Sequence, residues 1–163
     1  MEPLLEERAR RVLEACRRAS VRLALAEAST GGLVSASLTD IPGASAVVER
    51  GFIPYSNEAK TEQLGVPVEL MVAHGAVSKE VALALARGAL ARSHADLALA
   101  ETGIAGPSGG SESKPVGLVY IAVTRRGGAP LCERHVFTGD RAGIRRAAAA
   151  RGLELLLTLL ERS

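Results

Sequence analysis

Hydrophobic positions along the chain follow two patterns, one typical of helices and one typical of buried strands. Apolar side chains recur every three to four residues over 3–20, where Pro3 suits a first helical turn. Short apolar runs at 22–26 and 96–102 are too brief for helices and predict buried strands. By the same criteria we expect further helices at 33–38, 56–64, 67–73, 78–90 and 140–161, and further strands at 47–55, 117–124 and 131–138.

Capping and turn residues indicate where some of these elements begin and end. Ser29 or Thr30 has the side chain needed to cap the helix at 33–38. Pro54 cannot donate a hydrogen bond to a strand ladder. We therefore expect the strand at 47–55 to lie at a sheet edge or to end at this proline.

The order of the elements predicts an α/β fold. Helices and strands alternate early in the chain, and the segment 125–130 carries a hairpin signal between the last two strands. A mixed sheet covered by helices on both faces accommodates this order. No internal repeat or linker interrupts the pattern, so we expect a single domain over residues 1–163.

Composition and charge argue against a nucleic-acid partner. Aromatic residues make up only 2% of the chain, so it lacks the stacking platforms of single-strand binders. The net charge of +2, from 20 basic and 18 acidic residues, is too small to indicate a polyanion partner. The arginine-rich segments at 8–18 and 141–151 are expected to be solvated helix faces.

Several further classes are excluded by the cysteines, the histidines and the lengths of the apolar runs. Cys16 and Cys132 lack the paired spacing of a disulfide framework or a zinc site. The three histidines have no ligand spacing either, so no metal is expected. No apolar run approaches about 18 residues and no signal-peptide pattern is present. These features predict a cytoplasmic protein with no membrane partner.

Two glycine-rich loops are suited to binding a ligand. The loop at 27–32 joins a predicted strand to a predicted helix, where backbone N–H groups bind anions such as phosphate. An ordinary capped helix start explains the same residues equally well. The loop at 102–110 leaves the carboxyl end of a predicted strand, which suits either a backbone cradle or a flexible surface loop.

A third segment carries side chains suited to catalysis. Ser45 is followed by Tyr55, Asn57 and Lys60, and a serine hydroxyl needs a neighbouring group to take its proton. A lysine whose pKa is lowered by burial, beside a tyrosine, meets that need, although a solvated helix position is the alternative for Lys60. Glu101 interrupts an apolar strand. If buried it needs a partner or a raised pKa, and otherwise it faces a site or the strand end.

Seven spaced blocks, taken together, resemble the C-terminal domain family of the competence-inducible protein CinA, which includes the nicotinamide-nucleotide amidases. The resemblance runs from about residue 5 to 160, and Arg145-Arg146 fits it too. The blocks are AEASTGG at 26–32, LTDIPGASA at 38–46, YSNEAK at 55–60, GV at 65–66, GAVSKE at 75–80, TGIAGP at 102–107 and KPVGLVY at 114–120.

The resemblance implies a fold, a reaction and a set of site residues. The fold would be a three-layer α/β/α sandwich that forms homodimers. The reaction would be hydrolysis of nicotinamide mononucleotide, a small-molecule nucleotide, to nicotinate mononucleotide and ammonia in pyridine nucleotide recycling, with no metal or organic cofactor. Ser45 would be the nucleophile, with Tyr55 and Lys60 as its activating partners. The substrate would be bound by Thr30, Gly31, Gly32, Asn57, Thr102, Gly103, Gly106 and, at the phosphate, Arg145.

Three departures from the family pattern keep other hypotheses open. The family usually has Ser-Cys in place of Ala28-Ser29, threonine in place of Pro54, and an apolar residue in place of Glu101. A second hypothesis is therefore a nucleotide-binding module without catalysis. A third, suggested by the family name and the arginine-rich ends, is a partner-binding role in competence or DNA damage.

Overall fold

Five strands form one mixed sheet in the computed structural model, which describes residues 2–162. The strand order is β2-β1-β3-β4-β5. The first three strands in this order run parallel, and the β3–β4 and β4–β5 pairs are antiparallel, so the predicted mixed sheet is confirmed. The strands are β1 (Leu23–Glu27), β2 (Val48–Phe52), β3 (Leu97–Gly103), β4 (Leu118–Arg125) and β5 (Leu131–Val136).

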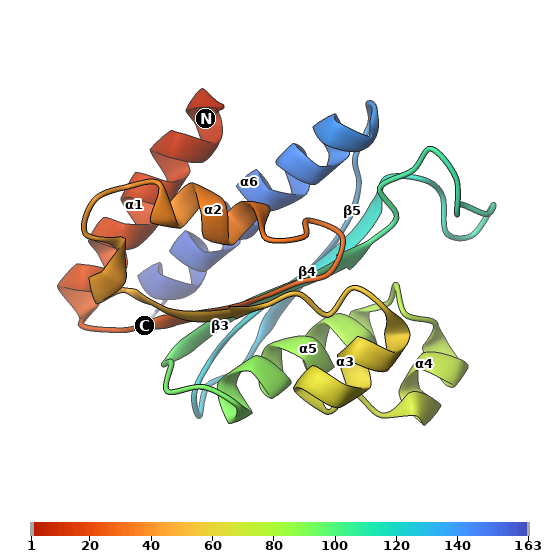
Figure 1. Ribbon diagram of the computed structural model, residues 1–163, viewed down its shortest axis with the longest axis horizontal. Helices are drawn as coiled ribbons and strands as arrows, with labels where there is room; N and C mark the ends of the chain where they lie inside the picture. The colour runs from red at the N-terminus through yellow and green to blue at the C-terminus, as the bar shows by residue number, and fades with distance from the viewer. Residues whose placement is uncertain (1, 163) are drawn as a thin grey trace.

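Helices cover both faces of the sheet, which gives the predicted three-layer α/β/α arrangement (Figure 1). Helices α1, α2 and α6 pack on one face, and α3, α4 and α5 lie on the other. Within the described part of the chain, no helix combines the length and apolar character needed to span a membrane. The helices are α1 (Pro3–Ala19), α2 (Leu33–Thr39), α3 (Asn57–Leu64), α4 (Val68–His74), α5 (Lys79–Ala91) and α6 (Arg141–Glu161), and a 3-10 turn covers Ala44–Ala46.

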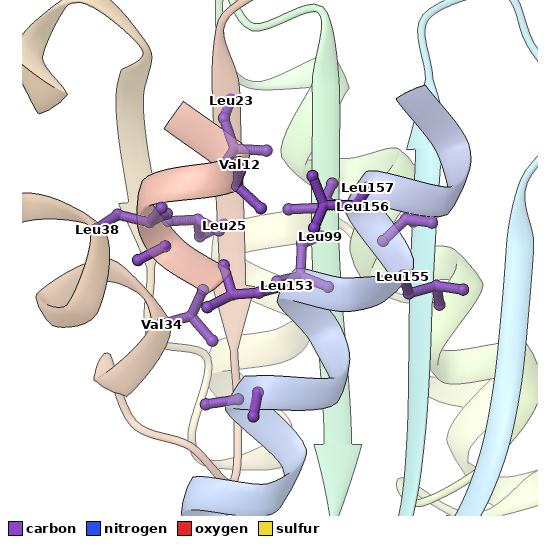
Figure 2. Packing of buried hydrophobic residues seen from close by; sticks show 14 of the residues in the cluster. Val12, Leu23, Leu25, Val34, Leu38, Leu99, Leu153, Leu155, Leu156 and Leu157 are labelled. Atoms are coloured by element: carbon purple, nitrogen blue, oxygen red, sulfur yellow. The ribbon is translucent and has the colours of Figure 1, made fainter. Parts of the chain in front are cut away.

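Two apolar clusters, one on each face, hold the layers together. On the α1/α2/α6 face, leucine and valine side chains interdigitate, as Leu25 of β1, Leu99 of β3 and Leu153 of α6 show (Figure 2). Burying each such leucine contributes about 1.5–3 kcal/mol. The opposite cluster is built largely from alanines of the central strands and α5, and these small side chains let α5 lie close to the sheet.

The strand order also determines which loops meet. Glu27 and Glu101 are register partners on the parallel strands β1 and β3, so the loops that follow them begin side by side. The edge strand β2 ends at Phe52, before Pro54, as the proline predicts. The next residues carry Tyr55 to the same carboxyl edge of the sheet, where ligands of open α/β sheets bind.

Candidate active site

A pocket of about 210 Å³ lies at the carboxyl ends of β1 and β3. Its walls come from the loops after these strands, the start of α3, the segment before α5 and the first residue of α6. Hydroxyl, amine and guanidinium groups thus converge on one small volume. The lining residues are Ala28, Ser29, Tyr55, Lys60, Ala76, Val77, Thr102, Gly103, Ala105 and Arg141.

Lys60 brings a buried amine to this pocket. The side chain is 4% exposed, and its Nζ donates to the Tyr55 carbonyl over 3.1 Å. Burial lowers the pKa of Lys60, while the nearby charges of Glu101 and Glu58 act in the opposite direction. The alternative of a solvated helix lysine does not hold, because Lys60 is enclosed by protein.

Tyr55 and Arg141 form the rim of the pocket. The Tyr55 side chain is largely exposed, and its hydroxyl accepts a hydrogen bond from Arg141 over 3.0 Å. The same guanidinium donates to the Gly106 carbonyl over 2.7 Å. Arg141 therefore ties the loop after β2 to the glycine-rich loop after β3.

Glu101 lies beneath the pocket floor with every oxygen partnered. It is 2% exposed, and its Oε1 accepts from both the backbone N–H and the hydroxyl of Thr30, each over 2.8 Å. Its Oε2 accepts a short hydrogen bond from the Ser29 hydroxyl. Burial raises the pKa of Glu101, and the hydrogen bonds from Ser29 and Thr30 act against that rise. The sequence predicts that a buried Glu101 needs a partner or a raised pKa, and in the structure it has both.

The carboxylate of Glu27 binds the free backbone N–H groups at the start of α2. Glu27, 1% exposed, accepts from the backbone N–H groups of Val34 and Ser35 over 2.7 and 2.9 Å. The N-cap position is Gly32, which has no side chain to cap the helix. The expectation of a Ser29 or Thr30 cap is therefore wrong, and Glu27 satisfies donors that an external anion would otherwise bind.

A second depression of about 490 Å³ adjoins the first and shares Ala105 and Arg141 with it. Arg145, the residue expected at the phosphate, lines this depression. It also donates to the carbonyls of Ser29 and Thr30 over 3.1 and 2.8 Å, so it fixes the loop after β1. The guanidinium groups of Arg141 and Arg145 thus line the two adjoining depressions.

Ser45 does not share the pocket with Lys60, which corrects the expected catalytic grouping. Ser45 is exposed on the 3-10 turn before β2, where it lines a separate depression with Thr39 and Ile41. Tyr55 follows the same strand at its other end. Five residues of strand span about 16 Å, so Ser45 lies near the amino end of β2 and Tyr55 beyond its carboxyl end, on the side of the sheet where the pocket lies.

The remaining expected residues divide between the pocket and its surroundings. Thr102 and Gly103 line the pocket, and the Thr102 hydroxyl donates to the Ala76 carbonyl over 2.9 Å. Thr30 is fully buried beneath it. The other expected residues lie outside the pocket lining. Gly31 and Gly32 precede α2, and Gly106 supplies the carbonyl that Arg141 binds. Asn57 lies in an apolar groove with Val68 and Met71.

Two polar residues of the pocket lining, Ser29 and Arg141, are not among the site residues predicted from the sequence. The sequence predicts Ser29 as a helix cap and as part of the glycine-rich loop at 27–32, and Arg141 as part of the arginine-rich segment at 141–151. A signal for Ser29 is present in the sequence, because it lies in the glycine-rich loop after a predicted strand, where ligands of open α/β sheets bind. For Arg141 the only signal was its place at the start of α6. Among residues 2–162, no three His, Cys, Asp or Glu side chains are grouped as a metal site would require.

Sequence comparisons match nearly the whole chain to one family. The CinA C-terminal domain family model matches residues 5–160. The nicotinamide-nucleotide amidohydrolase PncC of Escherichia coli K12 is 50% identical over 131 residues, which cover 80% of this chain and 79% of that protein. A CinA-like protein of Anaeromyxobacter is 50% identical over 83% of this chain, and the match covers 33% of that protein. The chain thus spans about a third of such longer relatives.

Solved structures have the same architecture. The competence/damage inducible protein CihA of Agrobacterium tumefaciens superposes with a TM-score of 0.95 at 45% identity, covering 98% of this chain and 97% of that chain. A CinA superfamily protein of Escherichia coli superposes with a TM-score of 0.91 at 30% identity, covering 95% and 90% of the two chains.

Proposed function

Because the chain belongs to the CinA C-terminal domain family, we propose that it is a nicotinamide-nucleotide amidohydrolase. The reaction converts nicotinamide mononucleotide and water into nicotinate mononucleotide and ammonia. The similarity to PncC, which extends over most of both chains, supports this substrate.

The observation that carries the proposal is the buried amine of Lys60 in a pocket lined by hydroxyl groups. Amide hydrolysis needs a nucleophile and a group that exchanges protons near neutral pH. Because burial lowers the pKa of Lys60, a larger fraction of its amine is neutral and able to accept a proton. A fully solvated lysine would be almost entirely protonated and could only donate.

The two adjoining depressions suit the shape of a nucleotide. The smaller pocket, of about 210 Å³, accepts the carboxamide-bearing ring beside Lys60 and Thr102. The larger depression, of about 490 Å³, accepts the ribose phosphate. Arg141 and Arg145 line it, and guanidinium groups bind phosphate oxygens with charge-assisted hydrogen bonds. Tyr55, on the rim, is placed to close over the ring.

Ammonia release from nicotinamide mononucleotide by the purified protein tests the proposal. Nicotinamide riboside and free nicotinamide serve as parallel substrates, and a preference for the mononucleotide is expected if the phosphate is bound. Lys60→Met should lower kcat by about 10²-fold or more, because the buried amine that exchanges protons is lost. Lys79→Met, at an exposed lysine at the start of α5, is the matched control and should retain activity.

Binding without turnover is the contrary result. If nicotinamide mononucleotide raises the melting temperature but the wild-type protein releases no ammonia at stoichiometric concentration, the chain is a binding module and the amidohydrolase proposal is wrong.

A further inference from the structure

The proposed reaction needs a nucleophile, and three hydroxyl groups line the pocket. The Tyr55 phenol lies on the exposed rim and is held by a guanidinium. The Thr102 hydroxyl donates to the Ala76 carbonyl, which cannot take up a proton at neutral pH. The Ser29 hydroxyl alone among these three donates to a carboxylate, that of Glu101. A hydroxyl bonded to a carboxylate has a proton acceptor in place before any ligand binds.

Glu101 is held so that one of its oxygens serves Ser29. Oε1 accepts two hydrogen bonds from Thr30, one from the backbone and one from the hydroxyl. These contacts fix the plane of the carboxylate and leave Oε2 directed at Ser29. Arg145 holds the carbonyls of Ser29 and Thr30 from the other side. Both partners of the Ser29–Glu101 hydrogen bond are therefore preorganised.

The Ser29 oxygen is accessible because its neighbour is a glycine. A Cβ at Gly103 would lie 3.0 Å from Ser29 Oγ and 2.7 Å from Val119 Cγ2. Glycine thus leaves open the space next to the hydroxyl, and Ser29 is partly exposed to the pocket whereas Thr30 is fully buried. A ligand carbonyl entering the pocket has a route to this oxygen.

On the basis of the proposed amidohydrolase function, we propose that Ser29 is the nucleophile and that Glu101 holds its hydroxyl and accepts its proton. Lys60 stands close enough to interact electrostatically with Glu101, so its amine is available to exchange the proton with this pair. Burial raises the pKa of Glu101, which makes it a stronger base than an ordinary carboxylate.

The chemistry balances in two steps. Ser29 Oγ attacks the carboxamide carbon while its proton moves to Glu101 Oε2, and a C–O bond forms. The C–N bond then breaks, and the nitrogen leaves as ammonia after taking that proton, which leaves the nicotinate mononucleotide acyl group, with its ribose phosphate attached, as an ester on Ser29. Water attacks the ester and gives one proton to Glu101, which returns it to Ser29 Oγ as the C–O bond breaks. The product acid releases its remaining proton to solvent.

Replacing the hydroxyl tests the assignment. Ser29→Ala should lower kcat by about 10³-fold or more while leaving the melting temperature and the binding of nicotinamide mononucleotide near wild type. Ser113→Ala, on the exposed part of the loop after β3, is the matched control. Acid quenching of wild-type turnover should trap the mass of the nicotinate mononucleotide acyl group on the peptide containing Ser29, and that mass should be absent in Ser29→Ala.

Replacing the carboxylate separates a chemical role from a structural one. Glu101→Gln keeps an acceptor for Ser29 but cannot take its proton, so kcat should fall by about 10²–10⁴-fold. The wild-type kcat/KM should rise with pH through a raised carboxylate pKa, and this limb should be missing from the residual activity of Glu101→Gln. Glu101→Asp should restore the limb with part of the rate. Equal pH profiles in wild type and Glu101→Gln would overturn the base assignment.

Comparing Ser45→Ala with Ser29→Ala distinguishes a failure of the Ser29 assignment from a failure of the proposed amidohydrolase function. Loss of turnover in Ser45→Ala together with full turnover in Ser29→Ala would overturn the Ser29 assignment and leave the amidohydrolase proposal standing. Absence of ammonia release from the wild type would instead remove the proposed function. A loss of turnover confined to Ser29→Ala supports both.

Discussion

The guanidinium of Arg141, the first residue of α6, donates a hydrogen bond to the Tyr55 hydroxyl over 3.0 Å. A second hydrogen bond from the same group reaches the Gly106 carbonyl. These contacts join the start of α6 to two loops that are far apart in the sequence, both of them at the rim of the pocket.

Replacing Arg141 should therefore weaken substrate use more than stability. The contacts of Arg141 lie at an exposed rim, where water replaces lost hydrogen bonds, so they stabilise the fold little, whereas a bound phosphate depends on the guanidinium. Arg141→Met should lower kcat/KM for nicotinamide mononucleotide by about tenfold or more, measured by ammonia release, and should move the melting temperature little. Arg87→Met, at an exposed position of α5, is the control. An unchanged kcat/KM in Arg141→Met would show that the rim contacts are not used.

Replacing Glu27 should destabilise the protein. Its buried carboxylate accepts hydrogen bonds from Val34, Ser35 and Thr30, and an alanine there leaves these donors without acceptors. A stranded buried donor costs about 1–3 kcal/mol, so Glu27→Ala should lower the free energy of unfolding by about 3 kcal/mol or more. Urea denaturation measures the loss. Glu27→Gln, which retains one acceptor oxygen, should lose less, and equal stability of both variants with wild type would contradict this account.

Gly88 of α5 should not tolerate a methyl group. A Cβ there would lie 2.1 Å from the Leu64 carbonyl oxygen at the end of α3. In an isolated helix glycine-to-alanine is stabilising by up to about 1 kcal/mol, so helix propensity and packing predict opposite signs. Gly88→Ala should lower the unfolding free energy by about 2 kcal/mol or more, because the two helices must separate. Gly128→Ala, whose Cβ would meet nothing closer than 3.4 Å, is the control for thermal denaturation.

The ion pair between Glu133 and Arg151 should make stability depend on acid pH. Two hydrogen bonds of 2.7 Å join the side chains, and together with the contact of His135 they lower the pKa of Glu133 from 4.5 to about 2. A carboxylate with a lowered pKa in the folded state stabilises the protein fully above pH 4.5, and this contribution disappears as the pH falls toward 2.

Glu133→Gln should therefore cost about 1–2 kcal/mol at pH 7, after allowance for partial solvent screening. The difference from wild type should shrink as the pH falls from 4.5 toward 2. Glu112→Gln, in an exposed loop, should show no such pH dependence. A constant difference between wild type and Glu133→Gln across this range would contradict the ion-pair explanation.

Local patterns in the sequence predict most of the elements and little of the site. The edge position and early end of β2 follow from Pro54, and the buried strands follow from short apolar runs, because these signals act within a few residues. The predicted side-chain cap of α2 was wrong because the contact that replaces it is not local. The free N–H groups at the start of α2 donate to Glu27, which lies seven residues before Val34 and is close to it only because the strand and the helix pack together.

The sequence by itself determined the α/β class, the mixed sheet and the clustering of glycine-rich loops after strands, since periodicity and turn chemistry are local. Only the tertiary structure decided which hydroxyl shares a pocket with the buried amine. The parallel register of β1 and β3 brings Ser29 to Glu101 in the pocket that Lys60 lines, while the direction of β2 leaves Ser45 at the other end of that strand. Strand order and direction arise from the packing of the whole domain, so no spacing along the chain encodes them.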